Sequence, residues 1–276
     1  TDSWRSDSSQ AFHCTTTTRV RPPILVCGQC RHQFSDPDTW PSDIAAEYTN
    51  LQDDDYVELF DVKRRTFKRA ANVLDSYVLP HSRILEVGSY AGLFLAECKN
   101  RGHDVRGIEP SRWGVEIARS QELHVDEGAA EDLLFQSELG DFDAVVSWDV
   151  LEHVYDPQHF LRGLSERCRD GGYVFVSTLD RTNWFARFTG RRWPWLIPMH
   201  LHYFDKETVQ SLGTKVGLQL ISTLPHVHYT NASYALSRLI GHGAMIEKSD
   251  FSGILTKLVF PVGLGDVRLF IFQKGG

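Results

Sequence analysis

The stretch RILEVGSYAG, residues 83–92, decides the fold of this chain. An apolar run ends at Glu86 and Val87, a turn with Gly88 and Gly92 follows, and the pattern then becomes helical. Glycine accepts positive φ and lets a ligand approach the backbone, while the first turn of the next helix offers free N–H groups. The stretch therefore predicts a strand, a ligand-binding turn and a helix.

Strands and helices alternate outward from this turn. Runs typical of helices separate the five apolar strand candidates at residues 83–87, 104–109, 123–128, 142–148 and 171–178. Two more strand candidates follow, LQLISTL and VRLFIFQK. Strands that alternate with helices form parallel βαβ units. The fold class predicted is therefore α/β, with a doubly wound, mostly parallel sheet that binds ligands at the carboxyl ends of its strands.

The rest of the chain departs from this alternation. Residues 1–40 have little apolar periodicity, and we expect a small N-terminal appendage there. Residues 41–80 are predicted to form a helical lead-in, and residues 81–276 the main domain. Within that domain the segments 180–204 and 226–262 lack a clean period, so we expect two insertions at the carboxyl edge of the sheet, where they would bind an acceptor.

Composition limits the partners. The formal net charge is −7 without a long basic run, which argues against nucleic acid. No apolar stretch approaches the ~20 residues that span a bilayer, and the first ten residues do not resemble a signal peptide. We therefore expect a cytoplasmic protein with no membrane partner, a small-molecule ligand and the capacity to form a homodimer.

The residues around the turn indicate which nucleotide it binds. Glu109 ends the second strand, 23 residues after Glu86, where a carboxylate can accept the hydrogens of a ribose diol. Tyr90 would crowd a pyrophosphate and Glu86 would repel one, which argues against an NAD-dependent oxidoreductase. A nucleoside with an amino acid tail fits better, because Glu86 can act on its ammonium group. S-adenosylmethionine has this structure, and a βα turn without ligand is the alternative.

Two later stretches carry a family resemblance. FDAVVSWDVLEHVYDP and LRGLSERCRDGGYVFVST follow at the spacing seen in class I S-adenosylmethionine-dependent methyltransferases, which the chain resembles from residue 83 to about residue 224. The resemblance implies a Rossmann-like sheet of seven strands, with the cofactor's methionine tail at the turn, its ribose at Glu109 and its adenine near Ala130 and Trp148. The chain departs from the family at Tyr90, where glycine is usual, and at Ala129, where an acid is frequent. The cofactor-binding residues expected are Glu86, Gly88, Ser89, Tyr90, Gly92, Glu109, Pro110, Ala130, Glu131, Trp148 and Asp149.

Methyl transfer to a hydroxyl gains about 10²–10⁴ in rate from a general base, and histidine is the usual one near neutral pH. His200, in PMHLHYF, is the favoured candidate and His153, in LEHV, the second, although either histidine could serve only to pack the fold. If that segment is extended, His200 and His202 point to the same side. Three aromatic residues nearby could stack on a sugar or aromatic acceptor or form a hydrophobic lid: Trp184, Trp193 and Trp195.

The five cysteines include a close pair, Cys27 and Cys30. In a cytosolic chain this C-x-x-C spacing suggests metal or redox chemistry rather than a structural disulfide. The pair resembles one knuckle of a zinc ribbon, with Cys14 as a third ligand. Ala11 stands where the partner of Cys14 would be, so the alternative is a degenerate ribbon without metal.

The predicted function is transfer of a methyl group from S-adenosylmethionine to a small molecule, most simply to a hydroxyl of a sugar or secondary metabolite. C- or N-methylation remains an alternative, because the same histidines could act as the base. A non-catalytic nucleotide-binding module is another alternative, against which the combination of Glu86, Gly88 and Glu109 argues.

Overall fold

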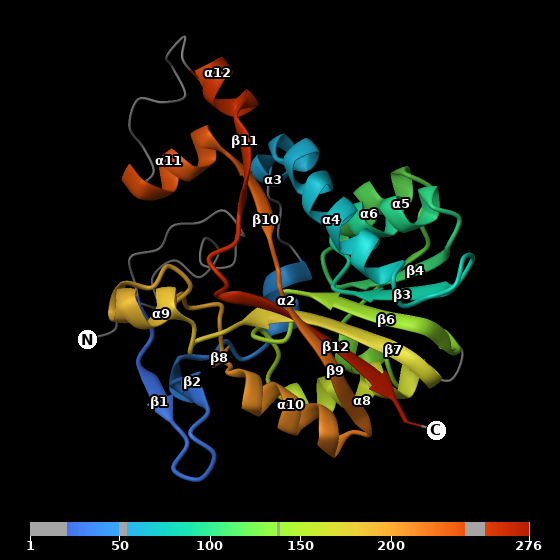
Figure 1. The fold of residues 1–276 in the computed structure, drawn as a ribbon, viewed down its shortest axis with the longest axis horizontal. Coiled ribbons are helices and arrows are strands. Elements are labelled where there is room, and N and C mark those ends of the chain that lie inside the picture. Colours follow the sequence, from blue (N-terminus) through green and yellow to red (C-terminus); the bar gives the residue numbers. More distant parts are fainter. Residues whose placement is uncertain (1–20, 50–53, 137–138, 241–251, 276) are drawn as a thin grey trace.

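The computed structural model describes residues 21–49, 54–136, 139–240 and 252–275 of the 276-residue chain. Within these ranges seven strands form the central sheet, in the order β5-β4-β3-β6-β7-β12-β9 (Figure 1). The strands are β3 (Arg83–Val87), β4 (Asp104–Glu109), β5 (Val125–Glu127), β6 (Phe142–Trp148), β7 (Cys168–Leu179), β9 (Leu218–Pro225) and β12 (Val267–Lys274).

The direction of the strands confirms the predicted sheet. The first five strands, β3 to β7, pair in parallel, and β12 lies antiparallel between β7 and β9. Strand order reverses between β3 and β6, since β4 and β5 extend the sheet on one side and β6 and β7 on the other. Ligands of open α/β sheets bind at such a reversal, beyond the carboxyl ends of the strands. The glycine turn after β3 lies at this point.

Helices cover both faces of the sheet, with α4, α5 and α6 on one side and α8 and α10 on the other (Figure 1). Alternation along β6 explains why both faces are apolar. Ala144 and Val146 pack with Leu74 of α4, whereas Val145 packs with Leu161 of α8. The helices are α4 (Phe60–Leu74), α5 (Leu93–Asn100), α6 (Arg112–Ser120), α7 (Ala130–Leu133), α8 (Pro157–Arg167) and α10 (Lys206–Lys215).

The N-terminal hairpin pairs with the segment that carries the expected catalytic histidine. Strands β1 (Ile24–Val26) and β2 (Gln33–Ser35) are antiparallel, and β2 also pairs with β8 (His202–Tyr203). The backbone N–H of Ser35 donates to the carbonyl of Leu201 at 2.8 Å. Two short helices, α2 (Ile44–Thr49) and α3 (Asp54–Glu58), connect the hairpin to α4. The hairpin and the first insertion thus share one small sheet.

The second insertion contains regular structure where the sequence suggested none. Strands β10 (His228–Asn231) and β11 (Val259–Val262) form an antiparallel ribbon that rises from the sheet beside α4 (Figure 1). The backbone N–H of Tyr229 donates to Thr66 Oγ1 at 2.8 Å and fastens the ribbon to α4. Helices α11 (Ala232–Ile240) and α12 (Ser252–Lys257) lie at its far end. None of the helices in the described ranges has both the length and the apolar character needed to cross a bilayer.

Candidate functional site

The turn after β3 is built so that only glycine fits at two positions. Gly88 has φ 79° and Gly92 has φ 74°, a region that other residues rarely adopt. A Cβ on Gly88 would collide with the side chain of Val150, and one on Gly92 would lie 2.5 Å from Leu123. This close packing holds the backbone of the turn against the carboxyl edge of the sheet.

Tyr90, the departure from the family pattern, has its own packing site. Its φ is 45°, and its ring lies edge-on to Tyr56, with ring centroids 4.6 Å apart. The ring of Trp113 lies on another side of the Tyr90 ring, with centroids 5.5 Å apart. A Cβ on Gly114 would come within 3.1 Å of Tyr90, so that glycine makes room for the tyrosine. The turn therefore accommodates a large ring by packing it against α3 and α6.

Glu109 ends β4 next to this turn. It is only 4% exposed, and its two carboxylate oxygens accept the backbone N–H groups of Tyr90, at 2.7 Å, and Ser111, at 2.8 Å. Burial raises the pKa of Glu109 to about 7, although these two hydrogen bonds oppose the rise. Each oxygen keeps a lone pair for a further donor. Glu109 can therefore accept both hydroxyl hydrogens of a ribose, as predicted for the cofactor site.

Glu86 lies on β3 beside Glu109 and is 2% exposed. Its Oε2 atom is buried without a hydrogen-bond partner in the described structure. Burial raises the pKa of Glu86 well above its ordinary value, and the charge of Glu109 adds to the rise. A buried carboxyl oxygen without a partner is costly, and a cationic ligand would relieve that cost. The ammonium group of S-adenosylmethionine fits this requirement.

The other predicted cofactor residues lie around the same edge. Ser89 is buried after Gly88, and its backbone N–H donates to the carbonyl of Ile108 at 3.1 Å. Trp148 is buried at the end of β6, where its Nε1 atom has no partner among the described residues. The remaining four are half-buried: Pro110, Ala130 and Glu131 near the ends of β4 and β5, and Asp149 directly after β6.

The two histidines predicted to be catalytic meet in one cluster with Glu152. Their ligand atoms and the Glu152 carboxylate all lie within 4.8 Å of one another, and the rings of His153 and His200 are 4.8 Å apart. His153 Nδ1 donates to the carbonyl of Met199 at 2.8 Å, and His200 Nδ1 donates to that of Trp195 at 2.7 Å. The Nε2 atoms therefore carry the lone pairs.

Burial sets the charges of this cluster. It lowers the pKa of His153 to about 4 and that of His200 well below its ordinary value, so both rings are neutral near pH 7. Burial, followed by the charge of Asp149, raises the pKa of Glu152 to about 8. Glu152 Oε2 accepts the hydroxyl of Thr178 at 2.8 Å. Two neutral imidazoles with free Nε2 lone pairs have the protonation state that a general base needs.

His202 is not beside His200, and the expectation that the two share one side is wrong. The strand begins only at His202, whose Nδ1 atom lies 3.0 Å from Nε2 of His32 on the N-terminal hairpin. Its ring also lies edge-on to Trp40, with centroids 5.5 Å apart. His200 closes a turn, in which its backbone N–H donates to the carbonyl of Ile197 at 3.1 Å, and the two histidines face different neighbours.

The tryptophans of the first insertion differ in role. Trp193 is fully buried, and its Nε1 donates to Asp266 Oδ2 at 3.0 Å. Trp195 donates to the same oxygen at 3.0 Å and is half-buried. Trp184 is exposed at the start of α9 (Trp184–Thr189). The expectation that Trp193 could stack on an acceptor is wrong, because its ring lies in the core of this segment.

Asp149 belongs to a second cluster that sequence reasoning missed. Its carboxylate lies within 4.8 Å of ring nitrogens of His226 and His228. The H-x-H spacing in PHVHY was a signal for this cluster, because alternate positions of an extended segment bring two rings to one side.

Cys27 and Cys30 lie in the turn between β1 and β2. The backbone N–H groups of Cys30 and Gln29 lower the pKa of the Cys27 thiol, with a smaller contribution from the thiol of Cys30. A thiolate stabilised by backbone N–H groups is suited to binding a metal. The third predicted ligand, Cys14, lies outside the described residues.

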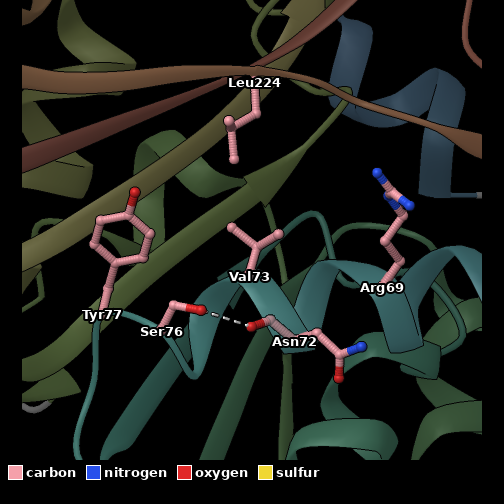
Figure 2. Close-up of a pocket in the computed structure, with 6 residues that line it drawn as sticks. All are labelled: Arg69, Asn72, Val73, Ser76, Tyr77 and Leu224. Carbon is pink, nitrogen blue, oxygen red and sulfur yellow. Dashed lines mark hydrogen bonds between the residues drawn. The ribbon is translucent and has the colours of Figure 1, made fainter.

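A hollow of about 370 Å³ lies between α4 and β9. Figure 2 shows Val73 pointing toward Leu224, with Tyr77 and Arg69 on either side and the Ser76 hydroxyl bonded to a neighbouring carbonyl. The residues predicted for cofactor or catalysis are not among the six that line it. The geometry around Glu86 and Glu109, rather than this hollow, therefore defines the candidate site.

Comparison with known proteins agrees with this geometry. A family model described as "Methyltransferase domain" matches residues 51–223, more than half of the chain. Two relatives, each named ubiquinone biosynthesis O-methyltransferase, come from Methylocella silvestris and Alkalilimnicola ehrlichii. The first is 34% identical over 45% of this chain and 51% of its own length, and the second is 36% identical over 36% and 42%. The chain thus spans about half the length of the curated relatives it matches.

Solved structures share the fold. A S-adenosylmethionine-dependent methyltransferase from Archaeoglobus fulgidus superposes with a TM-score of 0.54 at 17% identity, over 80% of this chain and 100% of its own. Magnesium protoporphyrin IX methyltransferase from Synechocystis, solved with S-adenosylhomocysteine, superposes with a TM-score of 0.53 at 14% identity. The match covers 82% of this chain and 90% of the other. At these identities the likeness concerns the fold.

Proposed function

The chain belongs to the methyltransferase domain family, and we propose that it transfers the methyl group of S-adenosylmethionine to a hydroxyl of a small molecule such as a sugar or secondary metabolite. The observation that carries this proposal is the pair of buried carboxyl groups that flanks the glycine turn. Glu109 keeps lone pairs for a ribose diol, and Glu86 has a buried oxygen without a partner. Together they match two polar groups of the cofactor, its ribose diol and its ammonium group.

Most of the catalytic advantage would come from alignment, because the sulfonium methyl is already activated. The site must hold the acceptor oxygen in line with the methyl–sulfur bond and exclude water. The new oxygen–carbon bond forms as the carbon–sulfur bond breaks, and sulfur keeps the electron pair. The hydroxyl proton then needs an acceptor.

The cluster of His153 and His200 supports the proposal of a histidine base. Each ring donates its Nδ1 hydrogen to a backbone carbonyl, so Nε2 is free to take a proton. We favour His200, because it belongs to the first insertion, which lies over the carboxyl edge of the sheet. Pairing of the N-terminal hairpin with β8 fixes the end of this insertion.

The names of the two relatives favour oxygen as the methylated atom. Carbon or nitrogen methylation is the alternative. Incubation with S-adenosylmethionine labelled with ¹³C in the methyl group, against a panel of sugars and phenols, tests the proposal by NMR. We expect an O-methyl resonance, absent with heat-denatured protein. Label on carbon or nitrogen would replace the proposal with the alternative.

The cysteine turn supports a second proposal, namely that Cys27 and Cys30 bind zinc with Cys14 as a third ligand. The backbone N–H groups that lower the pKa of Cys27 favour the thiolate that zinc binds.

A further inference from the structure

Asp149, His226 and His228 come together from separate parts of the chain. Their three potential ligand atoms all lie within 4.8 Å of one another. Asp149 Oδ2 is 3.5 Å from His228 Nε2, and the rings of His226 and His228 are 4.6 Å apart. Asp149 follows β6, whereas His226 follows β9 and His228 begins β10. The cluster therefore forms only when the second insertion folds back onto the carboxyl edge of the sheet.

Each member is held in place by a partner outside the cluster. Ser177 Oγ donates to Asp149 Oδ1 at 2.5 Å, which leaves Oδ2 to face the histidines. The His226 ring stacks on Trp148, with centroids 5.3 Å apart and planes 11° from parallel. His228 belongs to β10 and pairs in register with Val262. Such supporting contacts around a ligand set are typical of metal sites.

The backbone of Asp149 is itself unusual. Its φ is 55°, which is rare for a residue other than glycine. The backbone N–H of Asp149 donates to Ser177 Oγ at 2.9 Å and so helps to hold this conformation. Such conformations cost free energy and cluster at functional sites. Here the conformation turns the carboxylate out of the strand toward the two histidines.

The side chains of the cluster are of the types that bind cations. The cluster offers one carboxylate and two imidazole rings, each through one ligand atom, and a metal binds such groups in their deprotonated forms.

We propose that Asp149, His226 and His228 bind a divalent transition-metal ion. Imidazole and carboxylate ligands suit Zn²⁺, Fe²⁺, Co²⁺ or Ni²⁺, and three protein ligands leave at least one coordination position for another molecule. The position of the cluster after β6 places that open position at the carboxyl edge of the sheet, near the cofactor site.

The role of the metal rests on the proposed function. An acceptor hydroxyl bound at the open position would ionise more easily, because a metal stabilises the oxyanion. The metal would also fix the oxygen relative to the methyl group. The substrate class that follows is a small molecule whose hydroxyl has a neighbouring oxygen, since such a pair can chelate the metal.

The neighbouring cluster of Glu152, His153 and His200 is the rival site. Its atoms are equally close, but Glu152 Oε2 already accepts the hydroxyl of Thr178 at 2.8 Å. Asp149 Oδ2 instead faces His228 Nε2 at 3.5 Å. The experiment must nevertheless separate the two clusters.

Calorimetric titration with Co²⁺ tests the proposal, in a Cys27→Ser/Cys30→Ser background so that the cysteine turn does not contribute. We expect one ion per chain. His228→Ala should weaken binding by more than about 100-fold, because loss of a mere outer partner costs about 10- to 100-fold. Ser177→Ala should weaken Co²⁺ binding by about 10- to 100-fold, the range for such an outer partner. His124→Ala is the matched control, since His124 also lies near a carboxylate, Asp126, at 3.6 Å, but without a second histidine.

Three outcomes would overturn the proposal: no Co²⁺ binding, equal affinity in the His228→Ala protein, or loss of binding in His200→Ala while His228→Ala binds normally. His228→Gln serves if His228→Ala unfolds, which thermal unfolding without metal reveals. Binding of S-adenosylhomocysteine to the same proteins keeps the two proposals distinct. If the wild type does not bind S-adenosylhomocysteine, the cofactor assignment is contradicted. If it binds S-adenosylhomocysteine but not Co²⁺, only the metal site is contradicted.

Discussion

Glu86 and Glu109 are buried carboxyl groups on the adjacent parallel strands β3 and β4, and the charge of Glu109 helps burial to raise the pKa of Glu86. Two such groups destabilise each other when both are ionised. A ligand with one cationic end and one diol relieves the conflict, because it pairs with one carboxylate and donates hydrogens to the other. If S-adenosylmethionine binds here as proposed, relief of this conflict would add to its affinity.

Glu152 should make stability depend on pH. Its folded pKa of about 8 lies above the unfolded value, so the folded state binds the extra proton between these values and loses stability as pH rises toward 8. Between pH 6.5 and 8 the free energy of unfolding of the wild type should fall by about 2 kcal/mol more than that of Glu152→Gln. Urea unfolding of both proteins at the two pH values measures this difference. Parallel losses would show that Glu152 is ionised in the folded protein.

Gly88→Ala should destabilise the protein by about 2–4 kcal/mol, because it combines positive φ with a collision at Val150. Gly171→Ala is the control, since Gly171 has φ 73° but nothing within 4 Å of an added Cβ. It should cost only about 1–2 kcal/mol. Thermal or urea unfolding compares the two. Equal losses would mean that Val150 moves aside and that the turn is less tightly packed than described.

His200→Ala should lower turnover by about 10²- to 10⁴-fold, the range for a general base. Affinity for S-adenosylhomocysteine should stay unchanged, because in the proposed site Glu86 and Glu109, rather than His200, would hold the cofactor. His202→Ala is the control, as His202 is also buried in this segment but contacts His32 instead. Turnover and affinity are measured on the same preparation once an acceptor is known. Full turnover in His200→Ala would remove this histidine from the mechanism.

Protein purified without chelator should carry about one zinc ion per chain more than the Cys27→Ser/Cys30→Ser variant. The comparison with the variant matters, because the Asp149 cluster could also retain zinc. Elemental analysis of both proteins gives the difference. Equal zinc contents would support a degenerate ribbon that no longer binds metal.

The sequence predicted the central sheet because its signals are local. Apolar runs, glycine turns and helix caps lie within a few residues of one another from residue 83 to residue 178, and the structure has the five predicted parallel strands there. Ser111, for example, caps α6 by accepting the N–H of Gly114. Glu86 and Glu109 could be placed together because parallel strands end at one edge of the sheet.

The contacts of the insertions could not be predicted in this way. The hairpin around Cys27 pairs with β8 more than 160 residues later, and no periodicity reports such a pairing. Trp193 looked suited to stack on an acceptor, but Asp266 holds it in the core. His226 and His228 meet Asp149 only because the second insertion folds back. Side chains that converge through tertiary packing leave little trace in local sequence.

The binding of S-adenosylmethionine proposed here depends above all on Glu109, which would bind the ribose at the carboxyl edge of the sheet. The most direct test is calorimetric titration of S-adenosylhomocysteine into the wild type, Glu109→Ala and Glu127→Ala. Glu127 is the matched control, because it pairs in register with Glu109 on β5 but is exposed. We predict that Glu109→Ala loses about 1.5–3 kcal/mol of binding free energy, the range for hydrogen bonds to charged groups, and that Glu127→Ala loses little. Equal affinities for all three proteins would contradict the claim.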